Sequence, residues 1–212
     1  MRIPARFNGP PGTGNGGWCA GVFAAAGGAG QVTLRQPPPL ETDLEIKDEV
    51  VYAGDRVIAE LGAGDPGPGV DPVPWDTAVA AARDYPGFTA HPFPACFVCG
   101  PERAEGDGLR IFPGPLPDGR MAAPWTAPDE VSLPLVWAAL DCPGGWTVIR
   151  DGLVFVLGRI AAAVDELPVP GDHYVITSAV KDVTGRKALV DSALHDRGGR
   201  RLATARATWI RR

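Results

Sequence analysis

The sequence predicts an α+β fold in which a similar unit occurs twice along one chain. One small-residue helical pattern begins near residue 16 and a second apolar one near residue 133, and each leads into segments that alternate like β-strands. A stretch rich in Gly and Pro, residues 62–74, separates the two halves. We therefore predict an N-terminal unit over residues 1–65, a linker with a short helix over residues 66–91, and a C-terminal unit over residues 92–212.

The elements of the first half follow from local residue chemistry. Residues 1–17 are predicted to form a loop, because the glycines and prolines of residues 9–14 prevent regular structure. A helix is predicted from about Gly16 to Ala26, with Gly27-Gly28 as its C-cap. Strands are predicted over residues 31–35, 44–52 and 56–61, the last two around a turn at residues 53–55.

The second half is predicted to contain one buried helix and a long antiparallel meander. Before it, residues 75–85 form a short helix that stops at Pro86-Gly87. Residues 109–112 and 120–125 are predicted to pair as a hairpin, and the helix begins at about Leu133. Strands are then predicted near residues 153–164, 173–181, 186–195 and 201–210.

Composition indicates a globular protein and argues against two classes of partner. The chain has 212 residues, of which 45% are hydrophobic and 21% charged, so it can bury a core. A net charge of -5 argues against binding to nucleic acid. No apolar run reaches membrane length, since the best one, residues 153–164, is interrupted by Arg159. We therefore expect a cytoplasmic protein that binds neither nucleic acid nor a membrane.

Four cysteines in a chain of this length do not indicate a disulfide scaffold. Cys96 and Cys99 form a C-x-x-C pair, but a structural zinc ion needs four ligands, and no second pair has ligand spacing. Cys19 and Cys142 each lie in an apolar helical segment, where cysteine usually packs as a small hydrophobe. The sequence therefore predicts no metal and no other cofactor, with Cys96 and Cys99 as metal-free thiols.

Several short motifs, in this order and spacing, resemble those of acyl-CoA thioesterases with the hotdog fold. They are Asn15-Gly16-Gly17-Trp18, Pro37-Pro38-Pro39-Leu40, Cys96-Phe97-Val98-Cys99-Gly100-Pro101 with Gly108-Leu109, and Leu140-Asp141 with Gly145-Trp146. The chain resembles the double-hotdog, actinobacterial type of this family over most of its length, outside residues 62–90. The resemblance implies two units, each with a central helix wrapped by an antiparallel sheet, an acyl-CoA or acyl-carrier thioester as substrate, and a homo-oligomer.

The two halves depart from the family pattern in complementary ways. The second half has Ser132-Leu133-Pro134 where a His-Gly-Gly helix start is expected, and the first half has Ala24 at the position that matches Asp141. Neither half therefore holds a complete site. We predict one composite site, with the glycine-rich helix start from the first half and the carboxylate from the second.

The predicted chemistry assigns a role to each of these groups. The backbone N–H of Gly17 or Trp18 would polarise a thioester carbonyl at the helix start, where Asn15 and Gly16 also contact the substrate. Asp141 would activate water or attack the carbonyl carbon itself. Trp18, Trp137 and Trp146 are further candidates for substrate contact, one of which would line an acyl tunnel.

Three structural alternatives remain open at this stage. Asp141 would cap a turn before Cys142-Pro143-Gly144, or Asn15 would be an ordinary N-cap. In a shifted alignment Gly144-Gly145-Trp146 matches Gly16-Gly17-Trp18, which would make Asp141 a loop residue.

Two other functions also remain open. A non-catalytic acyl-binding protein derived from such an enzyme would also lack the His-Gly-Gly helix start in the second half and the acid in the first half. A hydratase is a weaker match, because such enzymes on this fold pair the aspartate with a histidine five residues later, where this chain has Trp146.

Overall fold

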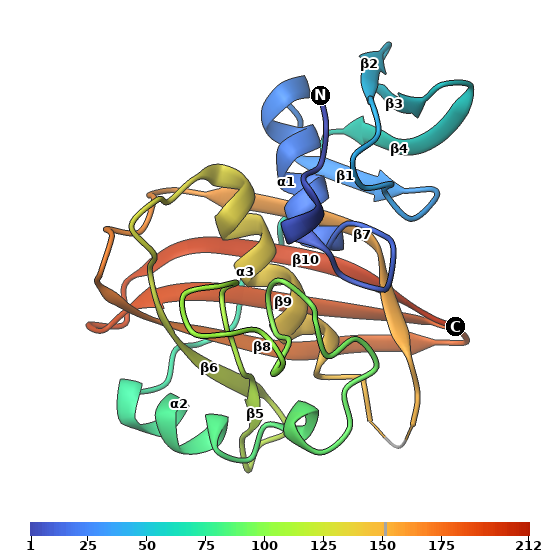
Figure 1. Ribbon diagram of the computed structural model, residues 1–212. Coiled ribbons are helices and arrows are strands. Elements are labelled where there is room, and N and C mark those ends of the chain that lie inside the picture. The colour runs from blue at the N-terminus through green and yellow to red at the C-terminus, as the bar shows by residue number, and fades with distance from the viewer. Residues whose placement is uncertain (151) are drawn as a thin grey trace.

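The computed structural model describes residues 1–150 and 152–212. Within them the chain forms one antiparallel sheet with helices on both faces (Figure 1). The α-helices are α1 (Gly16–Gly27), α2 (Trp75–Ala82) and α3 (Leu133–Gly145), with short 3-10 turns at Ala5–Phe7 and Pro86–Phe88. The strands are β1 (Gln31–Leu34), β2 (Glu45–Lys47), β3 (Val50–Ala53), β4 (Arg56–Gly62), β5 (Gly114–Pro115), β6 (Met121–Thr126), β7 (Phe155–Val164), β8 (His173–Thr184), β9 (Lys187–Asp196) and β10 (Arg201–Arg211).

The same connectivity occurs after α1 and after α3. The strand order is β2-β3-β4-β1-β7-β10-β9-β8-β6-β5. After α1 comes the central strand β1 and then the meander β2-β3-β4, whose last strand pairs with β1. After α3 comes the central strand β7 and then the meander β8-β9-β10, whose last strand pairs with β7. The central strands β1 and β7 pair antiparallel, with Val32 opposite Ile160, and so join the two sets into one sheet. Only the second set has strands before its helix, because residues 1–15 contain no strand.

Helices α1 and α3 pack against each other on one face of the sheet (Figure 1). Both are apolar around most of their circumference, as expected for helices that are covered on all sides. Glycines permit their close approach, since a Cβ on Gly21 would lie 2.5 Å from Pro134 Cα. One core cluster includes Phe23 and Leu140 from the two helices.

Helix α2 covers the opposite face of the sheet. The side chains of β6 alternate, so that Ala123 packs toward α3 while Ala122 packs with Ala78 and Ala81 of α2. The linker before α2 also lies on the sheet, where Thr177 Oγ1 donates a hydrogen bond to Val70 O at 3.2 Å.

The predicted helix boundaries in both halves agree with the structure to within a residue or two. Asp141 lies inside α3, which continues through Pro143 to Gly145. This excludes the alignment that would place Asp141 in a loop. The linker helix is shorter than predicted and ends at Ala82.

Two strand predictions were wrong. Residues 44–52 do not form one strand, because Asp48 (φ 48°) and Glu49 (φ 62°) make a tight turn between β2 and β3. Residues 109–112 are not in the sheet, and β6 pairs instead with β5. The N–H groups of Leu109 and Ile111 donate to carbonyls of the C-x-x-C segment, at Phe97 O (2.8 Å) and Val98 O (2.9 Å).

In the described part of the chain, every helix is too short or too polar to cross a membrane.

Candidate functional site

A cavity of about 550 Å³ opens where the start of α1 meets the end of α3. Its wall consists of segments that are far apart in sequence, namely residues within 9–16, 34–38, 91–99, 141–149, 155–158 and 209–212. Most of this wall is apolar, and the exceptions include Asn15, His91 and Asp141. The cavity thus combines an apolar volume with a few convergent polar groups, as ligand sites commonly do.

Asp141 is the acid of this cavity and is only 2% exposed. Its Oδ2 accepts a hydrogen bond from the backbone N–H of Gly17 at 2.9 Å, which ties α3 to the start of α1. Its Oδ1 is buried and has no partner among the described residues. Burial raises the pKa of Asp141 to about 8, although the Gly17 N–H acts in the opposite direction.

A second buried acid, Asp191 on β9, shows how this fold otherwise accommodates a carboxylate. Asp191 is fully buried, and the Arg206 guanidinium donates to both of its oxygens, at 2.8 and 3.0 Å. Asp141 has no such cation among the described residues. Burying a carboxylate without a cation is costly, so Asp141 lacks the structural reason that Asp191 has.

Asn15 caps α1 and also reaches the cavity. Its Oδ1 accepts from the Trp18 N–H at 2.9 Å, so it is the N-cap of the helix. Its Nδ2 lies 3.7 Å from the sulfur atoms of both Cys96 and Cys142. The two predicted interpretations of Asn15, as cap and as site residue, are therefore compatible.

The predicted carbonyl donors need correction. The N–H of Gly17 donates to Asp141 and that of Trp18 to Asn15, so neither is available to a substrate. Gly16 is the first residue of α1 and lines the cavity, and its N–H has no partner among the described residues. The free donor at the helix start is therefore one residue earlier than predicted.

The three predicted tryptophans separate into two groups. Trp146 lines the cavity. Trp18 instead stacks on Phe7 with ring centroids 3.7 Å apart, and Trp137 is buried in the core, so neither belongs to the cavity wall. The prediction that Trp18 and Trp137 contact substrate is not supported.

Three cysteines meet beside Asp141. The Sγ atoms of Cys96, Cys99 and Cys142 all lie within 4.8 Å of one another, and those of Cys96 and Cys142 are 3.9 Å apart. Thiol hydrogen bonds from Cys142 and Cys99 hold the pKa of Cys96 well below its ordinary value. These are the residues of the described chain that could hold a metal ion. Sequence spacing did not reveal the cluster, because Cys142 reaches it through the fold.

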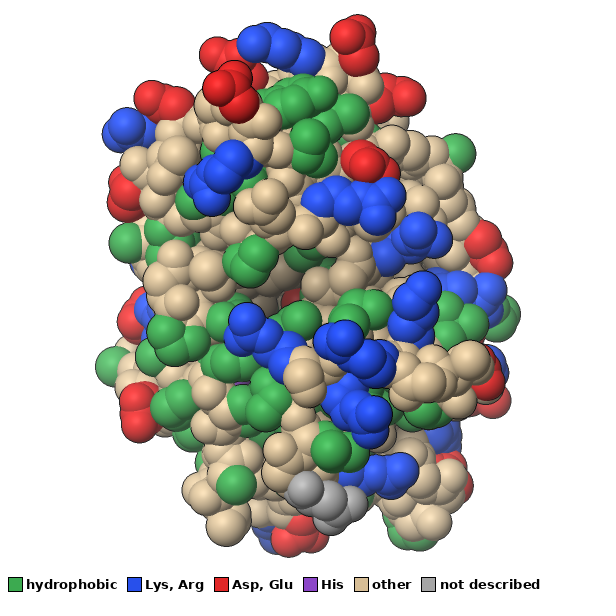
Figure 2. All heavy atoms as spheres, turned by 90° about the vertical axis from the view of Figure 1, so that its right-hand side faces the viewer, with side chains coloured by type: hydrophobic (Ala, Val, Ile, Leu, Met, Phe, Trp, Pro, Cys, Tyr) green, Lys and Arg blue, Asp and Glu red, His purple; other side chains and the backbone are tan. Residues whose placement is uncertain are grey.

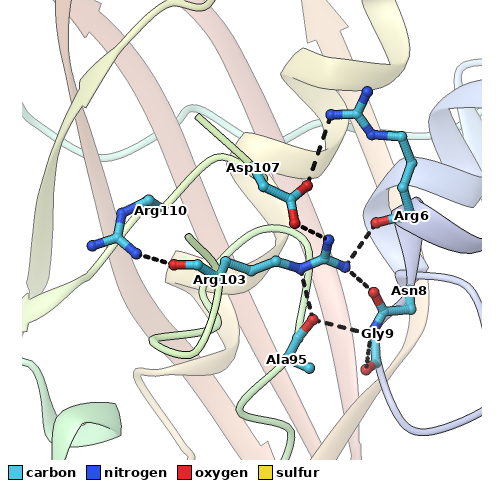
Figure 3. Close-up of polar contacts among 7 residues, drawn as sticks. All are labelled: Arg6, Asn8, Gly9, Ala95, Arg103, Asp107 and Arg110. Atoms are coloured by element: carbon cyan, nitrogen blue, oxygen red, sulfur yellow. Dashed lines mark hydrogen bonds and ion pairs between the residues drawn. The ribbon is translucent and has the colours of Figure 1, made fainter. Parts of the chain in front are cut away.

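The C-x-x-C segment is held in place by Arg103 (Figure 3). The guanidinium donates to Ala95 O at 3.0 Å and Arg6 O at 2.8 Å, and it pairs with Asp107 at 2.8 Å and with Asn8. Arg103 therefore fastens this segment to the first residues of the chain, which lead into Asn15.

Other parts of the wall were not predicted as site residues. Pro37 and Pro38 belong to a motif of the resemblance, but only as a strand exit, and His91 and the last residues of β10 carry no signal in the sequence. The remaining histidines, His173 and His195, lie outside the wall, on β8 and β9.

Comparison with known proteins identifies relatives by structure alone. No family model and no curated protein matches the sequence. The tesB protein of Mycobacterium avium subspecies paratuberculosis superposes with a TM-score of 0.60 at 13% identity, over 100% of this chain and 91% of that chain.

Two further structures match a smaller part of this chain. The Escherichia coli PaaI protein from the phenylacetic acid degradation operon has a TM-score of 0.42 at 14% identity, over 44% of this chain and 73% of its own. A hypothetical thioesterase from Streptococcus pneumoniae, solved with coenzyme A, has a TM-score of 0.42 at 16% identity, over 44% and 82%. Partial matches of this kind carry no argument about activity. The full-length superposition shows that this chain has the hotdog fold.

Proposed function

We propose that this protein hydrolyses acyl thioesters, with acyl-CoA as the substrate class, at one composite site between two hotdog units. The observation that carries the proposal is Asp141, a buried carboxylate without a cation whose Oδ1 has no partner among the described residues, in the wall of an apolar cavity. Positioned carboxylates of this kind act as bases or nucleophiles.

The double-hotdog division is part of the proposal. Residues 1–65 and 92–212 would be the two units, because each helix is followed by the same four-strand order. Residues 66–91, with α2, would connect them. The site would then be composite, since Gly16 and Asn15 come from one unit and Asp141 from the other.

The reaction follows from the positions of these groups. Asp141 takes a proton from water, and the oxygen attacks the thioester carbonyl carbon. The negative charge that develops on the carbonyl oxygen is stabilised at the positive end of α1 by the Gly16 N–H and by the Asn15 amide, which exchanges one of its long contacts with a cysteine Sγ for the substrate oxygen. The C–S bond then breaks, and the thiol leaves with the proton. In the nucleophilic variant, Asp141 attacks the carbonyl carbon and displaces the thiolate, which takes a proton from solvent, and water then hydrolyses the anhydride.

The mouth of the cavity supports CoA as the carrier. Arg35 and Arg212 line it, and Figure 2 shows a hollow in this face with several Lys or Arg side chains beside it. The net charge of the chain is -5, and Arg35 also forms an ion pair with Glu60, so part of this local positive charge is neutralised within the protein. Phosphate groups of CoA would be attracted to such a mouth, while the acyl chain enters the apolar interior.

The test is release of free thiol from a panel of acyl-CoA esters that differ in acyl length. We expect turnover of at least one ester, and Asp141→Asn should lower it by roughly 100-fold or more. Asp129→Asn changes an exposed acid before α3 and should leave it unaltered. Circular dichroism should show that both variants fold, because the side-chain oxygen of Asn at position 141 can still accept the Gly17 N–H.

Two results would count against parts of this proposal. An Asp141→Asn variant as fast as the wild type would remove Asp141 from the mechanism. Binding of acyl-CoA without turnover would favour an acyl-binding protein. After a single turnover in H₂¹⁸O, label in the carboxylate of Asp141 would identify the nucleophilic route, because direct attack by water places the label in the released acid.

A further inference from the structure

The three clustered thiols have the spacing of a metal site. In a tetrahedral zinc site with Zn–S bonds of about 2.3 Å, neighbouring sulfur atoms are roughly 3.8 Å apart. Cys96 and Cys142 Sγ are 3.9 Å apart, and Cys99 Sγ lies within 4.8 Å of both. Small shifts of side chains would bring all three to one ion.

The C-x-x-C segment is shaped to present two of these sulfurs. The Gly100 N–H donates to Cys96 O at 2.9 Å and closes a tight turn over residues 96–100. A Cβ on Gly100 would lie 2.5 Å from Cys96 N and O, so only glycine fits after the second cysteine. The turn directs both thiols toward α3, where Cys142 supplies the third.

N–H groups surround the sulfurs, as expected where thiolates are to be stabilised. Asn15 Nδ2 is 3.7 Å from both Cys96 and Cys142 Sγ, and His91 Nε2 is 3.4 Å from Cys99 Sγ. Second-shell donors of this kind orient and tune metal ligands. Cysteines that served only as packing hydrophobes would have no need of these donors.

His91 acts as one of these donors and not as a fourth ligand. Its Nδ1 accepts the Phe93 N–H at 2.9 Å, which places the proton of the neutral ring on Nε2, the atom that faces Cys99. A protonated ring nitrogen cannot bind a metal. The fourth position is therefore left to the cavity, which all three cysteines line.

We propose that Cys96, Cys99 and Cys142 bind one Zn²⁺ ion through three thiolates, with the fourth coordination position open to the cavity. Each thiol releases its proton to solvent when the metal binds. The ion connects the C-x-x-C segment to α3 beside Asp141 and so fixes one wall of the cavity. The proposal is independent of thioester hydrolysis, because it concerns binding of the metal alone.

The test is the zinc content of tag-free protein, purified under reducing conditions from zinc-supplemented medium and measured by mass spectrometry. We expect about one Zn²⁺ per folded chain, consistent with a single mononuclear site. Cys142→Ser and Cys99→Ser should each reduce it to background. Cys19→Ser, a buried cysteine of α1 outside the cluster, should keep it, and so should His91→Ala.

Cobalt gives a second readout that does not depend on a serine variant folding. Co²⁺ added to metal-free wild type should produce a thiolate-to-cobalt charge-transfer band, and Zn²⁺ should abolish it. Folded wild type that binds neither metal would overturn the proposal, as would full zinc retention in a folded Cys142→Ser variant. Loss of zinc in His91→Ala that excess Zn²⁺ does not restore would overturn the open fourth position, because loss of an N–H donor alone only weakens binding.

Discussion

Asn15 and Asp141 reach one cavity from different helices, so substitution can separate their roles. Asn15 combines an oxygen that caps α1 with an amide that faces the cavity. Asn15→Ala loses both, and we expect it to lower the free energy of unfolding by about 1 kcal/mol. It should reduce turnover less than Asp141→Asn does, because the Gly16 N–H remains.

The matched control is Asn15→Ser, which keeps a capping oxygen but loses the amide donor. Urea unfolding should show Asn15→Ser close to the wild type, while kcat/KM stays as low as in Asn15→Ala. If Asn15→Ser recovers both stability and kcat/KM, Asn15 serves only as a cap.

Individual residues differed in how far the sequence could predict them. Asp141 is an acid in an apolar helical run, a local contradiction that indicates a site without any coordinates. The cysteine cluster has no such signature, because Cys142 lies 43 residues beyond Cys99, a separation that no ligand-spacing pattern covers. The sequence does not show that the Gly16 N–H, and not the Gly17 N–H, is the free donor, because this depends on the tertiary contact between Gly17 and Asp141.

At the scale of elements, the contact between α1 and α3 sets the geometry of the site. It depends on glycines that face backbone, since a Cβ on Gly21 would lie 2.5 Å from Pro134 Cα and 2.9 Å from Trp137 Cβ. We expect Gly21→Ala to lower the free energy of unfolding by roughly 1–3 kcal/mol, as overpacking of a core does. Thermal and urea unfolding measure this.

Gly27→Ala in the same helix is the control for that prediction. Its added Cβ would approach only the end of the flexible Leu61 side chain, at 2.3 Å, and alanine favours the helix by about 1 kcal/mol. The two substitutions should therefore differ clearly in stability. If Gly21→Ala and Gly27→Ala change the free energy of unfolding equally, the backbone at Pro134 moves aside as easily as the Leu61 side chain, and the prediction is wrong.

The elements that sequence patterns predicted best are long strands bounded by turn residues. Strands β7 to β10 have ten or more residues each, with glycine-containing turns between β8, β9 and β10, and were predicted to within three residues. The turn at Asp48-Glu49 was missed because neither residue is a glycine or asparagine, the usual occupants of left-handed turn positions. Residues 109–112 have strand composition, but their N–H groups bond to the C-x-x-C segment.

At the scale of the whole molecule, the resemblance predicts self-association, and the sheet limits how it would occur. The edge strands are β2, with three residues, and β5, with two that include Pro115. Short, charged or proline-containing edges resist further pairing. We therefore expect a homo-oligomer that forms through a face of the molecule. Sedimentation velocity over a wide concentration range tests this, and a strictly monomeric profile would contradict it.

The pairing of β1 with β7 joins the strands after α1 to those after α3 in a way that sequence patterns could not predict. Each half carries its own helix and strand periodicities. Nothing in either segment specifies that Val32 will lie opposite Ile160, because that register depends on the packing of α1 against α3.

The missing strand before α1 has a consequence for how this protein can change. In the second half, β6 occupies the corresponding place, fixed by ladder hydrogen bonds to β8. In the first half a loop fills it. The loop is closed on itself by a bridge at Asn8–Gly14 and is joined to its surroundings by a bridge at Thr13–Pro39 and by the bonds from Arg103, and residues of this loop line the cavity. Insertions or deletions there would disturb no ladder and would cost little closure entropy. The entrance can therefore be reshaped for another thioester carrier while both helices, the acid and the sheet stay as they are.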